Sequence, residues 1–250
     1  MIEQKRKELL QMYQMWETEF KETCSQQRTS DYSFPYYIQI PDGWYDSEYR
    51  VMIVGEEGAG CNKRFDMPIT EAQKFNKDYL LRQMDKENQC DIDYEWNSSP
   101  FWRRIRTIQS LGAAICWNNL DKIHAIRKGR CNLKKKDRII LHSTTTKILA
   151  EEIKLLQPTH VIYFGWYGVS LAAELPKVWE QLYPGGEKDY SQWDKDKHKV
   201  LHIDGIYHIF TYHPGWGQRQ KNFRDNKSYE EIVLEEIIKT MRSIPPTNPL

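Results

Sequence analysis

Apolar side chains recur at spacings of three and four residues near the start of this 250-residue chain. Positions three and four apart share one face of an α-helix, so this spacing predicts an amphipathic helix over residues 2–20. Its apolar positions are Leu9, Met12, Tyr13, Trp16 and Phe20. The same reasoning predicts helices over residues 70–84, 100–111, 143–156 and 228–241.

Short apolar runs lie between these helices and predict buried strands over residues 50–54, 113–117 and 159–164. Asp204-Gly205 separates two further runs and predicts a two-residue hairpin turn. Strands that alternate with helices indicate an α/β protein. We therefore expect a single domain, a three-layer α/β/α sandwich around a central, mostly parallel four-stranded sheet. Residues 1–49 are expected to form an N-terminal helical extension, and residues 175–199 an insertion.

Composition narrows the function classes. The 36 basic and 35 acidic residues leave a net charge of +1, so only a local patch can attract a polyanion. No apolar stretch is long enough for a transmembrane helix, and the charged first residues do not resemble a signal peptide. The five cysteines are widely spaced and include no CxxC pair, which favours a reducing compartment. We expect a cytoplasmic protein, associated with the nucleoid if the source is prokaryotic, with no membrane partner.

The chemistry should lie where parallel strands end, because ligands of open α/β sheets bind beyond the carboxyl ends of the strands. Four segments follow predicted strands: residues 55–65, 118–122, 165–168 and 212–219. The first carries Glu56 and Glu57 in a glycine-rich turn without a phosphate-binding pattern. In the second, an Asn side chain offers donors and an acceptor that suit the edge of a pyrimidine, although Asn also serves ordinary turns.

The fourth segment places His213 directly before Pro214, with Trp216 in the glycine-containing loop that follows. An exposed aromatic at a loop tip suits base stacking or a wedge role, or it folds back onto the domain. Seven Lys or Arg residues and one acid lie between Arg127 and Arg138, so this stripe can follow a phosphate backbone or form a solvated surface.

Taken together, these segments resemble the uracil-DNA glycosylase superfamily, in the expected chain order. VMIVGEEGAG (51–60) is similar to the family's first motif, and SPFWRRI (99–105) to the Asn-Arg-Phe-Trp-Lys segment of the mismatch-specific branch. CWNNLDK (116–122) resembles the central strand-then-Asn motif, and QPTHVIYFG (157–165) the third strand. FTYHPGWGQR (210–219) resembles the last motif, with its His-Pro pair and DNA-intercalating loop.

The resemblance implies a role for each matched position. Gly55 would start the water-activating loop, with Glu57 at the catalytic position beside Glu56, and His213 would donate to the departing base. The implied base-binding residues are Asn119, which would read the flipped base, and Phe65 or, as second choice, Phe101, which would stack on it. The expected DNA-binding residues are Trp216, Arg219, Lys122, Arg127, Lys134, Lys135 and Lys136.

The chain also departs from the family pattern. Gly58 replaces a proline, Glu57 is one methylene longer than the usual Asp, and no close cysteine pair exists for an iron–sulfur cluster. We expect no cofactor and no metal, since His202, His208 and His213 lack a ligand spacing. We expect a monomer that binds DNA, either duplex or single-stranded. Three hypotheses follow: a monofunctional glycosylase for uracil or another modified pyrimidine, a glycosylase for bulky modified bases of foreign DNA, or a non-catalytic nucleic-acid-binding relative.

Overall fold

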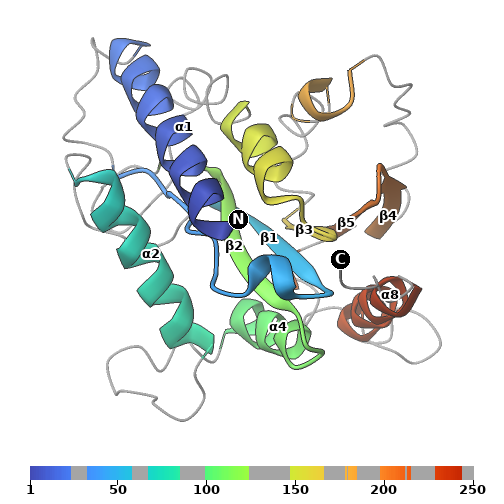
Figure 1. Ribbon diagram of the computed structural model, residues 1–250. Helices are drawn as coiled ribbons and strands as arrows, with labels where there is room; N and C mark the ends of the chain where they lie inside the picture. Colours follow the sequence, from blue (N-terminus) through green and yellow to red (C-terminus); the bar gives the residue numbers. More distant parts are fainter. Residues whose placement is uncertain are drawn as a thin grey trace.

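The computed structural model of the chain describes residues 1–23, 33–57, 67–84, 99–123, 147–165, 178, 180–184, 198–211, 213–214 and 229–243. Figure 1 shows strands in the middle of the molecule and helices on both sides. The longer described helices are α1 (Ile2–Thr23), α2 (Ile69–Met84), α4 (Pro100–Gln109), residues 147–156 and α8 (Tyr229–Ser243), and η2 (Trp44–Asp46) is a short 3-10 helix. None of these described helices is both long and apolar enough to span a membrane.

The described strands form one sheet in the order β2-β1-β3-β5-β4. The strands β1 (Arg50–Glu57), β2 (Ala114–Asp121), β3 (His160–Phe164) and β5 (Ile206–Thr211) run parallel, and β4 (His198–Ile203) is antiparallel to β5. The predicted α/β class and mostly parallel sheet are confirmed. The predicted strand number is wrong, because the described sheet has five strands.

The additional strand comes from the hairpin at Asp204-Gly205. Both turn residues have left-handed backbones, with φ of 50° and 78°, which is the geometry of a tight turn between twisted strands. The turn places β4 beside β5, so residues 198–199 of the expected insertion belong to the sheet.

Two apolar cores, one on each face of the sheet, give the three layers. Met52 and Val54 of β1 point into a core shared with α1 and residues 147–156, whereas Val51 and Ile53 point into a core shared with α4 and α8. This alternation follows from the two-residue period of a strand. Helix α2 packs along the edge strand β2 and contributes to both cores (Figure 1).

The N-terminal helix is an integral part of the domain. It spans Ile2–Thr23, close to the predicted range, and buries Leu9, Tyr13, Trp16 and Phe20 in the first core. The segment after it packs there too, since Trp44 is fully buried and its indole N–H donates to the carbonyl of Leu156 at 2.8 Å. Residues expected to form an N-terminal extension therefore pack into the first core of the domain.

Strands β1 and β2 are longer than their apolar runs predict. Val54 and Trp117 were the expected last residues, but pairing continues through Gly55 with Asn119 and Glu57 with Asp121. Two expectations are therefore corrected: Gly55 does not start a loop, and Asn118 and Asn119 do not follow the strand. All lie within the sheet, because the backbone hydrogen bonds of a ladder can extend beyond the apolar side chains.

Candidate functional site at the carboxyl edge of the sheet

The four parallel strands finish at one edge of the sheet. Glu57 ends β1 opposite Asp121 of β2, and Phe164 ends β3 opposite Thr211 of β5. The amide of Gly165 donates to the carbonyl of Thr211 at 3.2 Å and extends this edge by one residue. The described parts of the four segments expected to carry the chemistry thus meet where ligands of α/β sheets bind.

Asn119 and Gly55 form the first contact of this site. Asn119 is buried, with 1% of its surface exposed, and neither its side-chain oxygen nor its nitrogen has a hydrogen-bond partner among the described residues. A β-carbon on Gly55 would lie 2.7 Å from Asn119 Oδ1, so only glycine leaves room for the amide there. Two predicted site residues are therefore brought together, and the amide can still pair with a ligand.

The residues of this edge share one face of the sheet. Ile53, Ile115 and Ile209 point into the core beneath α4 and α8. Side chains repeat their direction every second residue, so Gly55, Asn119 and Thr211 lie on that same face.

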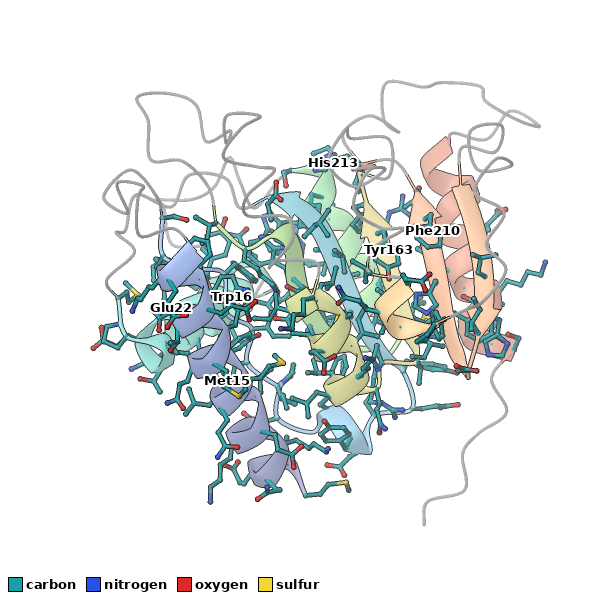
Figure 2. All side chains as sticks on the ribbon, turned by 90° about the horizontal axis from the view of Figure 1, so that it is seen from above. Met15, Trp16, Glu22, Tyr163, Phe210 and His213 are labelled. Atoms are coloured by element: carbon teal, nitrogen blue, oxygen red, sulfur yellow. The ribbon has the colours of Figure 1, made fainter. Side chains whose placement is uncertain are left out.

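Phe101 and His213 form an aromatic wall on the same face. Ser99 caps α4 by accepting from the Trp102 amide, which places Phe101 in the first turn. The Phe101 ring stacks on the exposed His213 imidazole, with centroids 5.6 Å apart and planes at 10°. It also meets the Phe164 ring edge-on at 5.7 Å. His213 lies at the end of the sheet (Figure 2), so the structure unites the second-choice stacking residue with the predicted imidazole donor.

Asp121 is a site residue that the sequence analysis did not single out. It is buried, with 2% exposed, and lies two residues beyond Asn119 on the same strand, hence on the same face. Its Cα is the register partner of Glu57. The sequence signal for Asp121 was its position two residues after Asn119. That spacing indicates a shared sheet face only if β2 extends to Asp121, which the apolar run did not predict.

A buried ion pair occupies the opposite face of β2. Lys122 Nζ lies 2.7 Å from both carboxylate oxygens of Glu152, and both side chains are fully buried. The Tyr13 hydroxyl donates to Glu152 at 2.5 Å, and Asn118 Nδ2 donates to it at 2.8 Å. Asn118 Oδ1 accepts from the Lys122 ammonium and from the backbone amide of Asn119. We refer to Tyr13, Asn118, Lys122 and Glu152 as the Lys122 network.

This position corrects the prediction that Lys122 contacts DNA. Burial lowers the pKa of the Lys122 ammonium, while the Glu152 carboxylate opposes this by favouring the charged form. Burial and Glu152 raise the pKa of Tyr13 well above its usual value. The sequence did contain a sign of the pair: Glu152 falls in the buried stripe of Leu149, Ile153 and Leu156, where a charge needs a partner.

Several predicted residues lie outside the described part of the chain. These are Phe65, Arg127, Lys134, Lys135, Lys136, Trp216 and Arg219, together with the side chains of Glu56 and Glu57.

Two buried histidines serve the interior rather than the site. The His208 ring pairs with the Tyr163 hydroxyl at 3.1 Å and the Tyr183 hydroxyl at 2.8 Å, and burial lowers its pKa to about 3. Burial likewise lowers the pKa of His160 to about 4. Among the described residues, no three His, Cys, Asp or Glu side chains are grouped to hold a metal ion.

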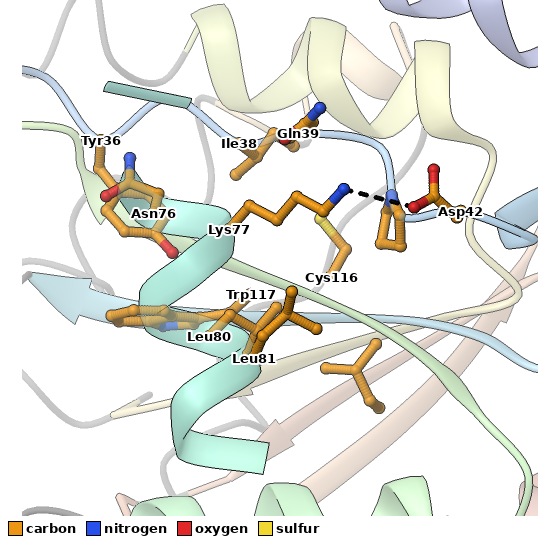
Figure 3. Close-up of a pocket in the computed structure, with 12 residues that line it drawn as sticks. Tyr36, Ile38, Gln39, Asp42, Asn76, Lys77, Leu80, Leu81, Cys116 and Trp117 are labelled. Atoms are coloured by element: carbon orange, nitrogen blue, oxygen red, sulfur yellow. Dashed lines mark hydrogen bonds and ion pairs between the residues drawn. The ribbon is translucent and has the colours of Figure 1, made fainter. Parts of the chain in front are cut away.

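A separate cavity of about 210 Å³ lies between α2, the segment of residues 36–42 and the edge strand β2. Lys77 Nζ lies 3.3 Å from Asp42 Oδ2, and Figure 3 shows this pair above Cys116 and Trp117. Its floor is the middle of β2 rather than the strand ends. Burial raises the pKa of the Cys116 thiol well above its usual range, so this thiol is not a reactive nucleophile.

Comparison with known proteins gives a limited result. No family model matches the chain. A 68-residue segment is 31% identical to the type IV pilus biogenesis factor PilY1 homolog of Xylella fastidiosa (strain Temecula1 / ATCC 700964). The match covers 26% of this chain and 5% of the length of that protein.

Proposed function

We propose that this chain is a monofunctional DNA glycosylase that flips out uracil or another modified pyrimidine and hydrolyses its N-glycosidic bond, leaving an abasic site. One observation carries the proposal. The buried Asn119 amide, with no partner among the described residues, lies on the same sheet face and at the same edge as the stacked Phe101 and His213 rings. A planar heterocycle with donors and acceptors at its edge fits this combination.

Asn119 supplies the reading group. Its amide offers one acceptor and two donors, which can pair with the edge of a flipped pyrimidine. Leaving such a group buried without a partner costs about 1–3 kcal/mol. A base that satisfies the amide recovers this free energy, so the site favours a ligand with a matching edge.

Phe101 and His213 supply the flat wall and a donor. A flipped base can join the aromatic stack, and base stacking on an aromatic side chain is worth about 1–3 kcal/mol. The departing base carries negative charge, which an imidazole N–H stabilises by donating to its carbonyl oxygen. Phe164 supports Phe101 from the edge and thus holds the wall in place.

The reaction needs a carboxylate near the sugar. Glu57 takes a proton from water as the water oxygen attacks the sugar carbon, the carbon–nitrogen bond breaks, and the electron pair leaves with the base. Asp121 is the alternative carboxylate, since it is the register partner of Glu57 on the site face. Phosphate contacts are proposed for the stripe from Arg127 to Arg138, and a wedge role for Trp216.

The test is a panel of duplexes that each carry one altered base, uracil, another modified pyrimidine or a bulky base, assayed for abasic sites by alkaline strand cleavage. We expect the wild-type protein to release at least one base. Glu57→Gln should lower turnover by about 10²-fold or more with DNA binding kept. If Asp121→Asn shows this loss and Glu57→Gln does not, Asp121 is the catalytic carboxylate. DNA binding without any abasic site would overturn the proposal in favour of a non-catalytic binder, and release of bulky bases alone would move the substrate to that class.

Asn119→Ala has a matched control in Asn76→Ala. Asn76 is also buried, but its amide donates to the Tyr37 carbonyl at 2.9 Å. Asn119→Ala should lose activity at little cost in stability, because it removes an amide with no described partner. Asn76→Ala should lose about 1 kcal/mol of stability and keep its activity. Equal activity losses in both variants would show that Asn119 has no special part in the site.

A further inference from the structure

The Lys122 network lies directly behind Asn119. Asn118 and Asn119 are consecutive residues of β2, so their side chains project from opposite faces of the sheet. Asn119 belongs to the proposed base site, whereas Asn118 turns to the core that α1 shares with residues 147–156. Asn118 Oδ1 accepts from the Asn119 backbone amide at 2.8 Å, which joins the network to the residue that would read the base.

The network is anchored from three separate parts of the chain. Tyr13 belongs to α1, Glu152 to the helix of residues 147–156, Asn118 to β2, and Lys122 follows directly after β2. The Tyr13 hydroxyl donates to Glu152 and accepts from the Ile38 amide at 3.1 Å.

The backbone at the end of β2 is held as well. The carbonyl of Lys122 accepts from the Tyr36 amide at 2.6 Å. Residues 1–49, the expected extension, therefore hold the chain at the end of β2, three residues beyond Asn119.

Stability alone gives a weak reason for such an arrangement. Taking two charges out of water is costly, and apolar side chains of similar volume are often equally or more stabilising than a buried ion pair. The network does provide orientation, because each Lys122–Glu152 contact is short and Asn118 is bonded on both sides. Hydrogen-bonded buried networks favour a single arrangement of their members.

We infer that the Lys122 network is a positioning device that fixes the orientation of Asn119 and so determines how selectively the site reads its base. The effect on base selectivity rests on the proposed function, whereas the orientation of Asn119 by the network does not. Freed from the network, the Asn119 peptide can rotate, and its amide then meets the base edge less well. A misplacement of about 1 Å can cost about 10²-fold in rate, so turnover and base discrimination should suffer while DNA binding does not.

The main variant is the double substitution Lys122→Met with Glu152→Leu, which removes both charges together so that neither is left unpaired. We expect it to fold, with a KM for duplex DNA within about twofold of wild type. Its kcat should fall by about 10- to 100-fold. The ratio of kcat/KM between the best base and the next best should shrink by about tenfold, a change that mere loosening of the fold does not produce.

Two further variants complete the test. Tyr13→Phe removes a single hydroxyl from the network and should lower kcat and base discrimination by a smaller factor than the double variant. If the double variant does not fold, Tyr13→Phe carries the test. Glu151→Gln with Lys154→Gln is the matched control, because this exposed pair lies on the same helix, 3.0 Å apart. The control should behave as wild type. Unchanged discrimination in both network variants would overturn the inference.

A second readout separates this inference from the proposed function. In protein with ¹⁵N-labelled asparagine, the Asn119 signals are identified by their loss in Asn119→Ala. Hydrogen exchange of the Asn119 backbone amide should be at least about tenfold faster in the double variant, because Asn118 loses the partners that orient its oxygen. If the wild type releases no base, the proposed function fails, and the exchange rates alone decide: unchanged rates overturn the positioning role and faster rates support it.

Discussion

The side-chain oxygen of Asn119 lies 2.7 Å from the position that a β-carbon on Gly55 would occupy. The two residues are register partners on adjacent parallel strands, so the ladder sets the spacing of their Cα atoms. Gly55 is not among the glycines with a positive φ, and its requirement is therefore one of space. This pair links a glycine of the first strand to the amide that the proposed site uses.

Gly55→Ala should impair the site while the fold remains. The added methyl group displaces the Asn119 amide, and we expect kcat/KM for base release to fall by about 10²-fold. Gly205→Ala is the control, since nothing lies within 4 Å of its β-carbon position but its φ is +78°. It should lose about 1–2 kcal/mol of stability with unchanged activity per folded molecule. Full activity in Gly55→Ala would show that Asn119 is not held at this spot for function.

Phe101→Ala should remove the wall on which the base stacks. We expect a loss of about 1–3 kcal/mol of transition-state binding, or about 5- to 150-fold in kcat/KM, on single-stranded and duplex DNA alike. Phe75→Ala is the matched control, because Phe75 packs edge-on against Phe34 at 5.6 Å in the core on the opposite face of the sheet. The control should lose stability but keep its kcat/KM per folded molecule. A Phe101→Ala variant that likewise loses only stability would assign Phe101 to packing alone.

Breaking the buried ion pair from one side should be costly. Lys122→Met leaves the Glu152 carboxylate buried without its cation, and we expect the free energy of unfolding to fall by about 3–5 kcal/mol in urea titrations. The double variant Lys122→Met with Glu152→Leu should regain most of that loss. A single variant as stable as wild type would mean that Glu152 reaches water or becomes protonated at no cost.

Stability should decrease as the solution becomes acidic, because the two buried histidines resist protonation. Their pKa values are about 4 for His160 and about 3 for His208 in the folded protein, against 6.5 for an unperturbed imidazole. Between pH 6.5 and pH 4 the unfolded chain binds protons that the folded chain does not. Each histidine then lowers the free energy of unfolding by about 1.4 kcal/mol for each pH unit below 6.5.

Denaturant titrations between pH 6 and pH 4.5 measure this effect. His208→Gln should reduce the slope of stability against pH by about 1.4 kcal/mol per pH unit. Ile209→Val, on the same strand, should lose about 0.5–1.5 kcal/mol at every pH and keep the wild-type slope. An unchanged slope in His208→Gln would show that this imidazole titrates alike in both states.

Local patterns were sufficient to predict most of the elements. The apolar spacing of α1, the start of α4 at Pro100 and the Asp204-Gly205 turn each depend on interactions between residues close in the chain. Helical periodicity, the preference of proline for the first turn of a helix and turn geometry are determined by such neighbours, and the structure confirms all three. The candidate residues Gly55, Asn119, Phe101 and His213 were named from the resemblance of their segments to glycosylase motifs, which are also short stretches of sequence.

Tertiary structure alone decided how those residues meet. The contact of Gly55 with Asn119 depends on the register of β1 and β2, and the stacking of Phe101 on His213 joins segments far apart in the sequence. Lys122 was expected to contact DNA, but it is buried in an ion pair with Glu152, because a charge can leave water only where distant partners replace its hydration. Periodicity predicts which side of a helix or strand is apolar. Which other helix or strand packs against that side depends on the packing of the whole chain.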